Sequence, residues 1–399
     1  MTKANLKNIN VYPLKSGAGI ELSSSWVEEL GLTFDRRFVV ASPEGEFFTA
    51  RTEPSLCLIQ ANLTASGLIL TAPDMPALTL DYQKLTNNYT NVRVWKDNIN
   101  AQQCSSNINS WFTQYLQKPS QLLFFGRDSQ RFVKNRKTQV GFADGYPLLL
   151  ISQASLEQLN TQIKTDETTI AMAQFRPNIV VNGCDAFAED SWQHIRIGEV
   201  EFEITKPCTR CIFTTIDPLT GEKHRQQEPL KTLKSYRQLE NGDVIFGQNL
   251  VPLNQGQIKQ GDSIEVLKTQ SPPVLKEPFT TSNQTKTAEN NEQTTSAIPK
   301  TKTPSIYFNS FNKTVKGNNQ QSLLEQGEDA GLLLPYSCRA GMCGRCKVQL
   351  ISGEVSQHCQ DGLSDDEQNQ GYILSCSSTP LTDVVIEHPA RKRRADSQN

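Results

Sequence analysis

Several features are scarce in this chain, and each scarcity excludes a class of protein. Only four histidines occur among 399 residues, which leaves few ligands for a histidine-rich zinc site. The formal net charge is −2, so the chain lacks the basic excess of a nucleic-acid-binding protein. No apolar run is long enough to cross a bilayer, and residues 1–12 lack the apolar core of a signal peptide. We therefore predict a cytoplasmic protein that binds neither nucleic acid nor membrane.

Cysteine, by contrast, is abundant. The chain has ten cysteines, and five of them lie between Cys338 and Cys376. In a cytosolic protein of this length, clustered cysteines indicate metal or redox chemistry rather than disulfides.

A change of composition divides the chain. Residues 269–303 consist mainly of Thr, Pro, Asn, Gln, Ser and Lys, and such a segment buries too little apolar surface to offset the entropy lost on ordering. This predicts a flexible linker, and the chain length predicts two or three domains. The expected parts are domains 1–125 and 126–268, the linker 269–303, a domain at 304–390 and a basic tail at 391–399.

The region before the linker has mostly strand patterns. Residues 37–40 and 46–49 flank the turn Ser42-Pro43-Glu44-Gly45 and predict a hairpin, and Val200, Phe202 and Ile204 alternate as in a half-buried strand. Helices are fewer: one is predicted over residues 111–116, and another after a cap at Ser152. We expect a multidomain, β-rich protein with β-barrel domains and some helices, followed by the linker and an α+β domain.

Four cysteines have the spacing of a plant-type [2Fe–2S] ferredoxin. Cys338, Cys343 and Cys346 follow the pattern C-x4-C-x2-C, and 29 residues separate Cys346 from Cys376. Gly341 and Gly344 allow the backbone to wrap closely and to turn N–H groups toward the sulfurs. A zinc ribbon is the alternative, but it needs a second C-x2-C knuckle. Cys359 is the fifth cysteine of this segment and is interpreted as a bystander that does not bind the cluster.

The resemblance to plant-type ferredoxins covers residues 304–389 and implies a β-grasp domain with a potential near about −400 mV. Such a domain only carries electrons, so the rest of the chain must hold their source or their sink. No glycine-rich dinucleotide fingerprint follows a strand. This favours a sink in the N-terminal region, fed by a separate NAD(P)H-dependent flavoprotein reductase.

A pair of cysteines, Cys208 and Cys211, provides the candidate sink. They follow the predicted strand that ends at Ile204, and Arg210 between them would favour a thiolate. A thiolate is a soft ligand for a heavy metal. A C-x2-C redox pair and half of a zinc site are the alternatives, and the residues by themselves leave these open.

Basic residues recur near strand ends in the same region. They are Lys15, Arg36, Arg51 and Arg176. An anionic cofactor that carries a phosphate would need such groups, with Arg giving bidentate contacts.

Long ordered motifs in residues 5–268 resemble the MOSC-domain molybdenum cofactor proteins with their N-terminal β-barrel domain. With the ferredoxin domain, the whole chain is similar to YcbX-type proteins, and its first two-thirds are similar to the mitochondrial amidoxime-reducing component. The matching motifs are YPLKS (12–16), DRRF (35–38), TARTEP (49–54), ADGYPLLLIS (143–152), FRPNIVVNGCDAFAEDSW (175–192), PCTRCIFTTIDP (207–218) and EPLKTLKSYR (228–237).

The resemblance implies roles for individual residues. The molybdenum ligand falls on Cys211, with Cys208 as the second choice, and Asp144 falls on an acidic position near the metal. Gly145 and Tyr146 stand where eukaryotic relatives have small hydroxyl residues, a departure that bears on the substrate pocket. The residues implied to bind the pterin and its phosphate are Lys15, Ser16, Arg36, Arg51, Arg176 and Asn178.

The resulting hypothesis is a molybdenum cofactor-dependent reductase of N-hydroxylated compounds: hydroxylamines, amidoximes and N-hydroxylated base analogues. Its own [2Fe–2S] cluster would relay the electrons. The alternative is a carrier that delivers sulfur or molybdenum cofactor to a client. The ferredoxin domain argues against the carrier, because delivery needs no low-potential electron relay.

Overall fold

The computed structural model describes residues 4–163, 169–276, 304–318, 321–336, 341, 344–357, 360 and 362–389. The chain forms two compact units, Met1–Leu275 and Lys276–Asn399. The structure keeps residues 269–275 with the first unit, because Gln270 N–H donates to the Ser191 carbonyl and Leu275 forms a β-bridge with Leu239. Residues 269–275, predicted from the sequence as part of the linker, thus belong to the first unit.

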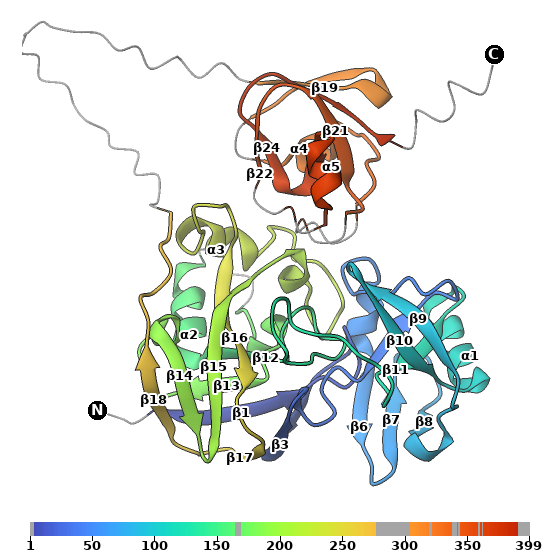
Figure 1. The fold of residues 1–399 in the computed structure, drawn as a ribbon, viewed down its shortest axis with the longest axis vertical. Helices are drawn as coiled ribbons and strands as arrows, with labels where there is room; N and C mark the ends of the chain where they lie inside the picture. Colours follow the sequence, from blue (N-terminus) through green and yellow to red (C-terminus); the bar gives the residue numbers. More distant parts are fainter. Residues whose placement is uncertain are drawn as a thin grey trace, which may run out of the picture. The chain divides into compact units, whose positions relative to one another are not determined.

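An eight-stranded sheet is the largest element of the first unit (Figure 1). Its order is β18-β14-β15-β16-β12-β13-β1-β2. Helices α2 (Gln153–Gln162) and α3 (Leu230–Tyr236) lie along it. The strands are β1 (Asn5–Val11), β2 (Ile20–Leu22), β12 (Leu148–Ser152), β13 (Ile179–Asn182), β14 (Trp192–Ile197), β15 (Val200–Thr209), β16 (Ile245–Pro252) and β18 (Ile264–Thr269).

The first strands of the chain belong to the same sheets as its later strands. β1 pairs antiparallel with β13, and β3 (Ser24–Glu28) pairs with β17 (Gly256–Lys259) and with β4 (Gly31–Leu32). The division predicted near residue 125 therefore separates two sequence segments, whereas the sheets join residues from both sides of it. Because early and late strands share these sheets, the loop after β1 lies near loops that follow later strands.

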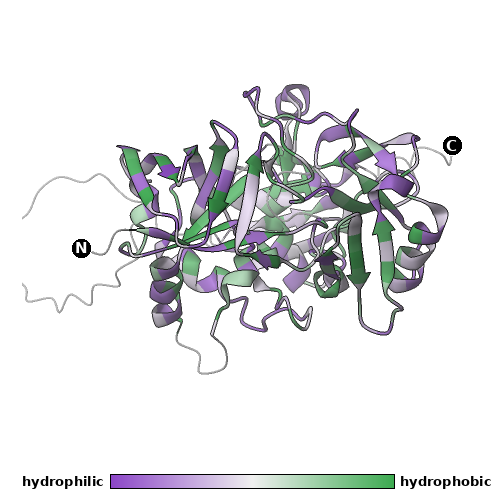
Figure 2. Cartoon of the chain, turned by 90° about the horizontal axis from the view of Figure 1, so that it is seen from below, coloured by the Kyte–Doolittle hydropathy of each residue, from purple (hydrophilic) through white to green (hydrophobic). Residues whose placement is uncertain are grey.

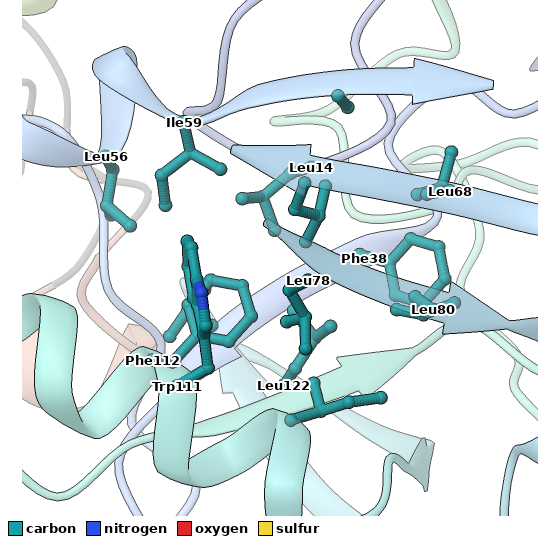
Figure 3. Packing of buried hydrophobic residues seen from close by; sticks show 14 of the residues in the cluster. Leu14, Phe38, Leu56, Ile59, Leu68, Leu78, Leu80, Trp111, Phe112 and Leu122 are labelled. Carbon is teal, nitrogen blue, oxygen red and sulfur yellow. The ribbon is translucent and has the colours of Figure 1, made fainter. Parts of the chain in front are cut away.

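Residues 38–124 build a second group of sheets with their own core. One sheet has the order β5-β11-β10-β9 and another the order β6-β7-β8, and α1 (Ser106–Leu116) packs on β8 and β11. Trp111 and Phe112 project from α1 toward Leu14, Ile59 and Leu78 (Figure 3). The strands are β5 (Phe38–Ala41), β6 (Gln60–Leu63), β7 (Gly67–Thr71), β8 (Leu78–Asp81), β9 (Tyr89–Val94), β10 (Asp97–Gln103) and β11 (Gln121–Phe124).

Local sequence signals match several of these elements. The Ser42–Gly45 turn is confirmed, because the Gly45 and Ser42 N–H groups donate to Ser42 and Glu46 carbonyls, although the second arm is only a bridge at Phe47. Ser152 caps α2 by accepting from the Ser155 N–H. Hydrophobic residues gather on the strands, and hydrophilic ones on many of the connecting loops (Figure 2).

The second unit holds a five-stranded sheet with the order β20-β19-β25-β21-β23 and a pair β22-β24. Ser322 and Glu325 form a capping box at α4 (Leu323–Asp329), and Ser364 and Glu367 form another at α5 (Asp365–Asn369). The strands are β19 (Ser305–Phe308), β20 (Lys313–Lys316), β21 (Lys347–Ser352), β22 (Val355–Gln357), β23 (Tyr372–Leu374), β24 (Ser378–Pro380) and β25 (Val384–Glu387). Together these strands and helices form the α+β fold expected for that region.

Candidate molybdenum cofactor site and iron–sulfur site

The two cysteines of the PCTRC motif have different surroundings. Cys208 lies in β15 and packs against the apolar cluster that contains Leu149 and Phe246, and burial raises the pKa of its thiol. Cys211 lies just beyond the strand and precedes the 3-10 helix η5 (Ile212–Thr215). Its backbone is fixed because its carbonyl accepts from the Thr214 N–H at 3.0 Å. Cys208 is therefore partly buried against an apolar core cluster, and Cys211 is the cysteine that contacts an arginine side chain.

Arg51 contacts the Cys211 sulfur. The Arg51 Nε donates to Cys211 Sγ at 3.2 Å, and its Nη2 donates to Asp144 Oδ2 at 3.2 Å. Asp144 Oδ1 in turn accepts from Lys15 Nζ at 2.5 Å, and Lys15 also donates to the Phe142 carbonyl. Four residues that are far apart in the sequence therefore form one connected group around the sulfur.

The charged residues of this group change one another's pKa values. Burial lowers the pKa of Lys15 to about 8, against the opposing effect of the Asp144 carboxylate. Partial burial by itself raises the pKa of Asp144, but the Lys15 and Arg51 charges outweigh it and hold that pKa well below its usual range. The Asp144 side chain is 51% exposed, and water therefore also solvates this carboxylate. At neutral pH Asp144 is an anion held between two cations.

Arg36 and Arg176 form a second group around Tyr12. The carbon at the centre of each guanidinium lies 4.2 Å from the centroid of the Tyr12 ring. Arg36 Nη1 donates to both Asp35 oxygens at 2.7 and 2.8 Å, and Arg36 Nη2 donates to the Arg176 carbonyl at 3.1 Å. Arg176 Nη1 donates to the Gly17 carbonyl. Burial, together with the nearby Arg36 charge, lowers the pKa of Arg176.

These surroundings fit an anionic cofactor. Arg176 Nη2 is buried and has no hydrogen-bond partner among the residues that the structure describes, and an unsatisfied buried donor costs about 1–3 kcal/mol. The two groups bring together the cations Lys15, Arg36, Arg51 and Arg176, while Asp35 and Asp144 are the carboxylates paired with them. A phosphate would satisfy the donor and offset the remaining positive charge.

Ser16 and Asn178 are occupied by backbone contacts. Ser16 Oγ accepts from the Ala50 N–H at 3.1 Å. Asn178 Oδ1 accepts from the Leu149 N–H at 3.2 Å, and its Nδ2 donates to the Asn10 carbonyl at 3.1 Å. Both residues therefore fix the loops that carry Lys15 and Arg176.

Arg210 is anchored on backbone carbonyls, and its charge lowers the pKa of the Cys208 thiol against the larger effect of burial. Its Nε and Nη2 donate to the Phe246 carbonyl at 2.7 and 2.6 Å, and its Nη1 donates to the Phe175 carbonyl. It therefore ties β15 to neighbouring chain segments. The cation in contact with the Cys211 sulfur is Arg51, which is 160 residues away in the sequence.

Arg131 was not found from the sequence. Its Nη2 donates to the Asp144 carbonyl at 2.8 Å, its Nη1 to the Gly141 and Ala143 carbonyls, and its Nε to Asp97 Oδ2 at 2.7 Å. It holds the loop that presents Asp144. A lone arginine in a basic segment carries no sequence signal for such a role. Next to Asp144, a Cβ atom at Gly145 would meet no described atom within 4 Å.

The ferredoxin cysteines are described in part. Cys346 Sγ lies 3.1 Å from Cys376 Sγ, and the Gly341 N–H donates to Cys376 Sγ at 3.4 Å. Gly341 and Gly344 have φ of 70° and 71°, values that favour glycine. The predicted N–H contact to a sulfur is thus present at Gly341. Cys338, Cys343 and Cys359 lie outside the described residues, and among those that are described no group of three metal-ligating side chains gathers.

Comparison with known families defines the class of protein. The MOSC N-terminal beta barrel domain matches residues 3–119, the MOSC domain matches residues 137–265, and the 2Fe-2S iron-sulfur cluster binding domain matches residues 306–381. The chain is thus a MOSC protein fused to a [2Fe–2S] domain. These domains indicate a molybdenum cofactor and a [2Fe–2S] cluster as its cofactors.

Curated relatives narrow the class. The chain is 36% identical to human mitochondrial amidoxime-reducing component 1 over 277 residues, which are 64% of this chain and 81% of the relative. It is 40% identical to human mitochondrial amidoxime reducing component 2 over 240 residues, covering 57% and 70%, and 32% identical to component 1 of Danio rerio, covering 64% and 82%. The chain belongs to the family of the amidoxime-reducing components and is a molybdenum cofactor-dependent oxidoreductase.

The crystal structure of pectocin M2 is 33% identical over 23% of this chain and 34% of that chain, with a TM-score of 0.21. In the described part of the chain, no helix has the length and apolar character needed to cross a membrane. The relatives are named as mitochondrial, and the cytoplasmic location of this chain stays a prediction.

Proposed function

We propose that this protein reduces N-hydroxylated compounds at a molybdenum cofactor ligated by Cys211, with electrons relayed through its [2Fe–2S] cluster. The observation that carries the proposal is the contact of Arg51 with the Cys211 sulfur, inside a group of buried cations. The amidoxime-reducing relatives support the substrate class. The proposed substrates are hydroxylamines, amidoximes and N-hydroxylated base analogues.

The overall reaction consumes two electrons and two protons. An R–NH–OH group becomes R–NH2, the N–O bond breaks, and the oxygen leaves as water. When bound, the molybdenum cofactor supplies the redox chemistry of this step. The cluster carries one electron at a time, and a separate NAD(P)H-dependent flavoprotein is the proposed donor.

The residues of this chain bind the cofactor and handle protons. Arg36 and Arg176 are proposed to hold the phosphate end, because Arg176 has a buried donor to offer. Lys15, with a pKa of about 8, is the proposed proton donor. Asp144 stays ionised between Lys15 and Arg51 and so positions these two cations.

A reconstituted assay tests the proposal. Purified protein is analysed for molybdenum and iron, and is then mixed with NADPH, a flavoprotein ferredoxin reductase and benzamidoxime or a hydroxylaminopurine. We expect one molybdenum and two irons per chain, and formation of benzamidine or the aminopurine. Zinc alone in the metal analysis would overturn the assignment of both cofactors.

The rival carrier function gives a different result in the same preparation. A carrier would transfer its cofactor or sulfur to a cofactor-free acceptor enzyme and would show no NADPH-dependent turnover. The second unit argues for the reductase, because the Cys346 and Cys376 sulfurs converge there, as a cluster site requires. Transfer without turnover would favour the carrier.

A further inference from the structure

Trp95 occupies an unusual place in the fold. It lies in the two-residue turn between β9 and β10, where Val94 pairs with Asp97, and its φ is 57°. Hairpin turns are normally exposed, and a bulky residue at positive φ is strained. Trp95 is nevertheless only 7% exposed. The fold therefore holds this side chain inside at a conformational cost, which indicates a role for it there.

The Trp95 ring borders the Cys211 group. Its centroid lies 4.5 Å from the central carbon of the Arg51 guanidinium and 5.8 Å from Lys15 Nζ. The Phe47 ring meets it edge to face, with 4.9 Å between the centroids. Arg51 is the residue that contacts the Cys211 sulfur. The Trp95 and Phe47 rings thus line one side of this group. Arg51 contacts both Trp95 and the proposed metal ligand, Cys211.

The indole N–H of Trp95 has no acceptor among the described residues. Trp95 Nε1 is buried and has no hydrogen-bond partner within the described part of the chain. Trp111 shows the usual arrangement, because its Nε1 donates to the Pro76 carbonyl at 2.7 Å. A buried donor without an acceptor costs about 1–3 kcal/mol, and a bound molecule that accepts from it would remove that penalty.

We infer that Trp95 orients the N-hydroxylated substrate: its N–H donates to an oxygen or imine nitrogen of the substrate, and its ring lines the pocket beside Cys211. The inference rests on the proposed function. It assigns the substrate rather than the cofactor to Trp95 because the two arginine groups differ. Arg36 and Arg176 surround Tyr12, whereas Trp95 contacts Arg51, the arginine joined to the proposed metal ligand.

The substitution Trp95→Phe tests the inference in the full-length protein loaded with both cofactors. Phe keeps an aromatic ring and removes only the donor. Trp111→Phe is the matched control, because it removes a donor that already has a partner. For each variant we would measure molybdenum content, thermal stability, KM and kcat for benzamidoxime, and Kd for benzamidoxime with the oxidised protein in the absence of reductant.

For Trp95→Phe we expect full molybdenum content, unchanged or higher thermal stability, and a rise of about three- to tenfold in KM and Kd with a smaller change in kcat. Trp111→Phe should lose thermal stability and keep its KM. In 15N spectra the Trp95 indole signal, identified by its loss in Trp95→Phe, should move when benzamidoxime is added, whereas the Trp111 signal should stay.

An unchanged KM and Kd in Trp95→Phe, or an indole signal that does not move, would overturn the inference. Loss of molybdenum from that variant would also overturn it, because Trp95 would then hold the cofactor. If the wild-type protein with full molybdenum neither bound nor reduced benzamidoxime, the proposed function would fail and the inference with it. That outcome is recognised by the failure of the wild-type control.

Discussion

The Nε of Arg51 donates to the sulfur of Cys211 at 3.2 Å, although the two residues are 160 positions apart in the chain. Arg51 comes from the loop after β5, and Cys211 comes from the end of β15. The contact exists because the early strands of the chain enter the same sheets as the later ones. It joins the two sequence domains at the proposed metal ligand.

Replacing Cys211 should separate the roles of the two cysteines. We expect Cys211→Ala to lose bound molybdenum and to reduce benzamidoxime at less than about one-hundredth of the wild-type rate, because the thiolate ligand is gone. Cys208→Ala is the control and should keep its molybdenum, since Cys208 packs in an apolar cluster. Metal analysis and NADPH-dependent turnover check both variants. Full activity in Cys211→Ala would contradict the assignment.

Arg176 should determine how tightly the cofactor is held. Arg176→Met removes the buried Nη2 donor, which has no partner among the described residues, and we expect the cofactor affinity to fall about ten- to a hundredfold. Arg127→Met is a comparable change at an exposed arginine and should have no effect. Dialysis followed by molybdenum and pterin analysis measures the loss. Equal retention by the two variants would exclude a role for Arg176 in holding the phosphate.

Lys15 should titrate near pH 8 in the cofactor-free protein. Asp144 raises this pKa, so Asp144→Asn should lower it further. Because the pKa of Lys15 is lower in the folded state than the ordinary value of 10.5, the folded protein binds fewer protons between about pH 8 and 10.5. The contribution of Lys15 to the free energy of unfolding therefore rises with pH across this window. NMR titration of the lysine Nζ signals checks it, and a midpoint above pH 10 would disagree.

Arg131 should contribute to stability through the loop that it holds. Arg131→Met leaves the Gly141, Ala143 and Asp144 carbonyls without this donor, and we expect the free energy of unfolding to fall by about 2–4 kcal/mol. Asp97→Asn is the milder control, because the Asp97 side chain is 39% exposed, and should cost less than about 1 kcal/mol. Urea denaturation of the first unit measures both. An equal loss would assign the effect to the ion pair instead.

Substitutions of individual cysteines in the ferredoxin domain should have different effects on the visible spectrum of the protein. Cys376→Ser removes a sulfur that lies 3.1 Å from Cys346 Sγ, and we expect it to abolish the [2Fe–2S] absorption and the reductase-dependent turnover while molybdenum stays bound. Cys359→Ser, the predicted bystander, should keep the spectrum. Iron analysis distinguishes a lost cluster from a shifted one. A cluster retained by Cys376→Ser would remove Cys376 from the ligand set.

Local signals predicted the short-range features well. The turn at Ser42–Gly45 and the Ser152 cap depend on residues within a few positions of one another, and the structure contains both of them. The residue-125 division had no such local determinant. It crosses sheets that pair β1 with β13, and antiparallel pairing of distant strands leaves no mark in composition.

The sequence by itself determined the ferredoxin spacing, the linker composition and the set of basic residues, because each is a property of residue type and separation along the chain. Through the family resemblance it placed the metal ligand on Cys211, with Cys208 as the second choice, but it did not identify Arg51 as the residue that contacts the Cys211 sulfur. Only the tertiary structure decided the surroundings of these residues: it packs Cys208 against Leu149 and Phe246, ties Arg210 to backbone carbonyls, and brings Arg51 to Cys211. The reason is physical, since burial and charge pairing at a site depend on which strands meet in the folded sheets.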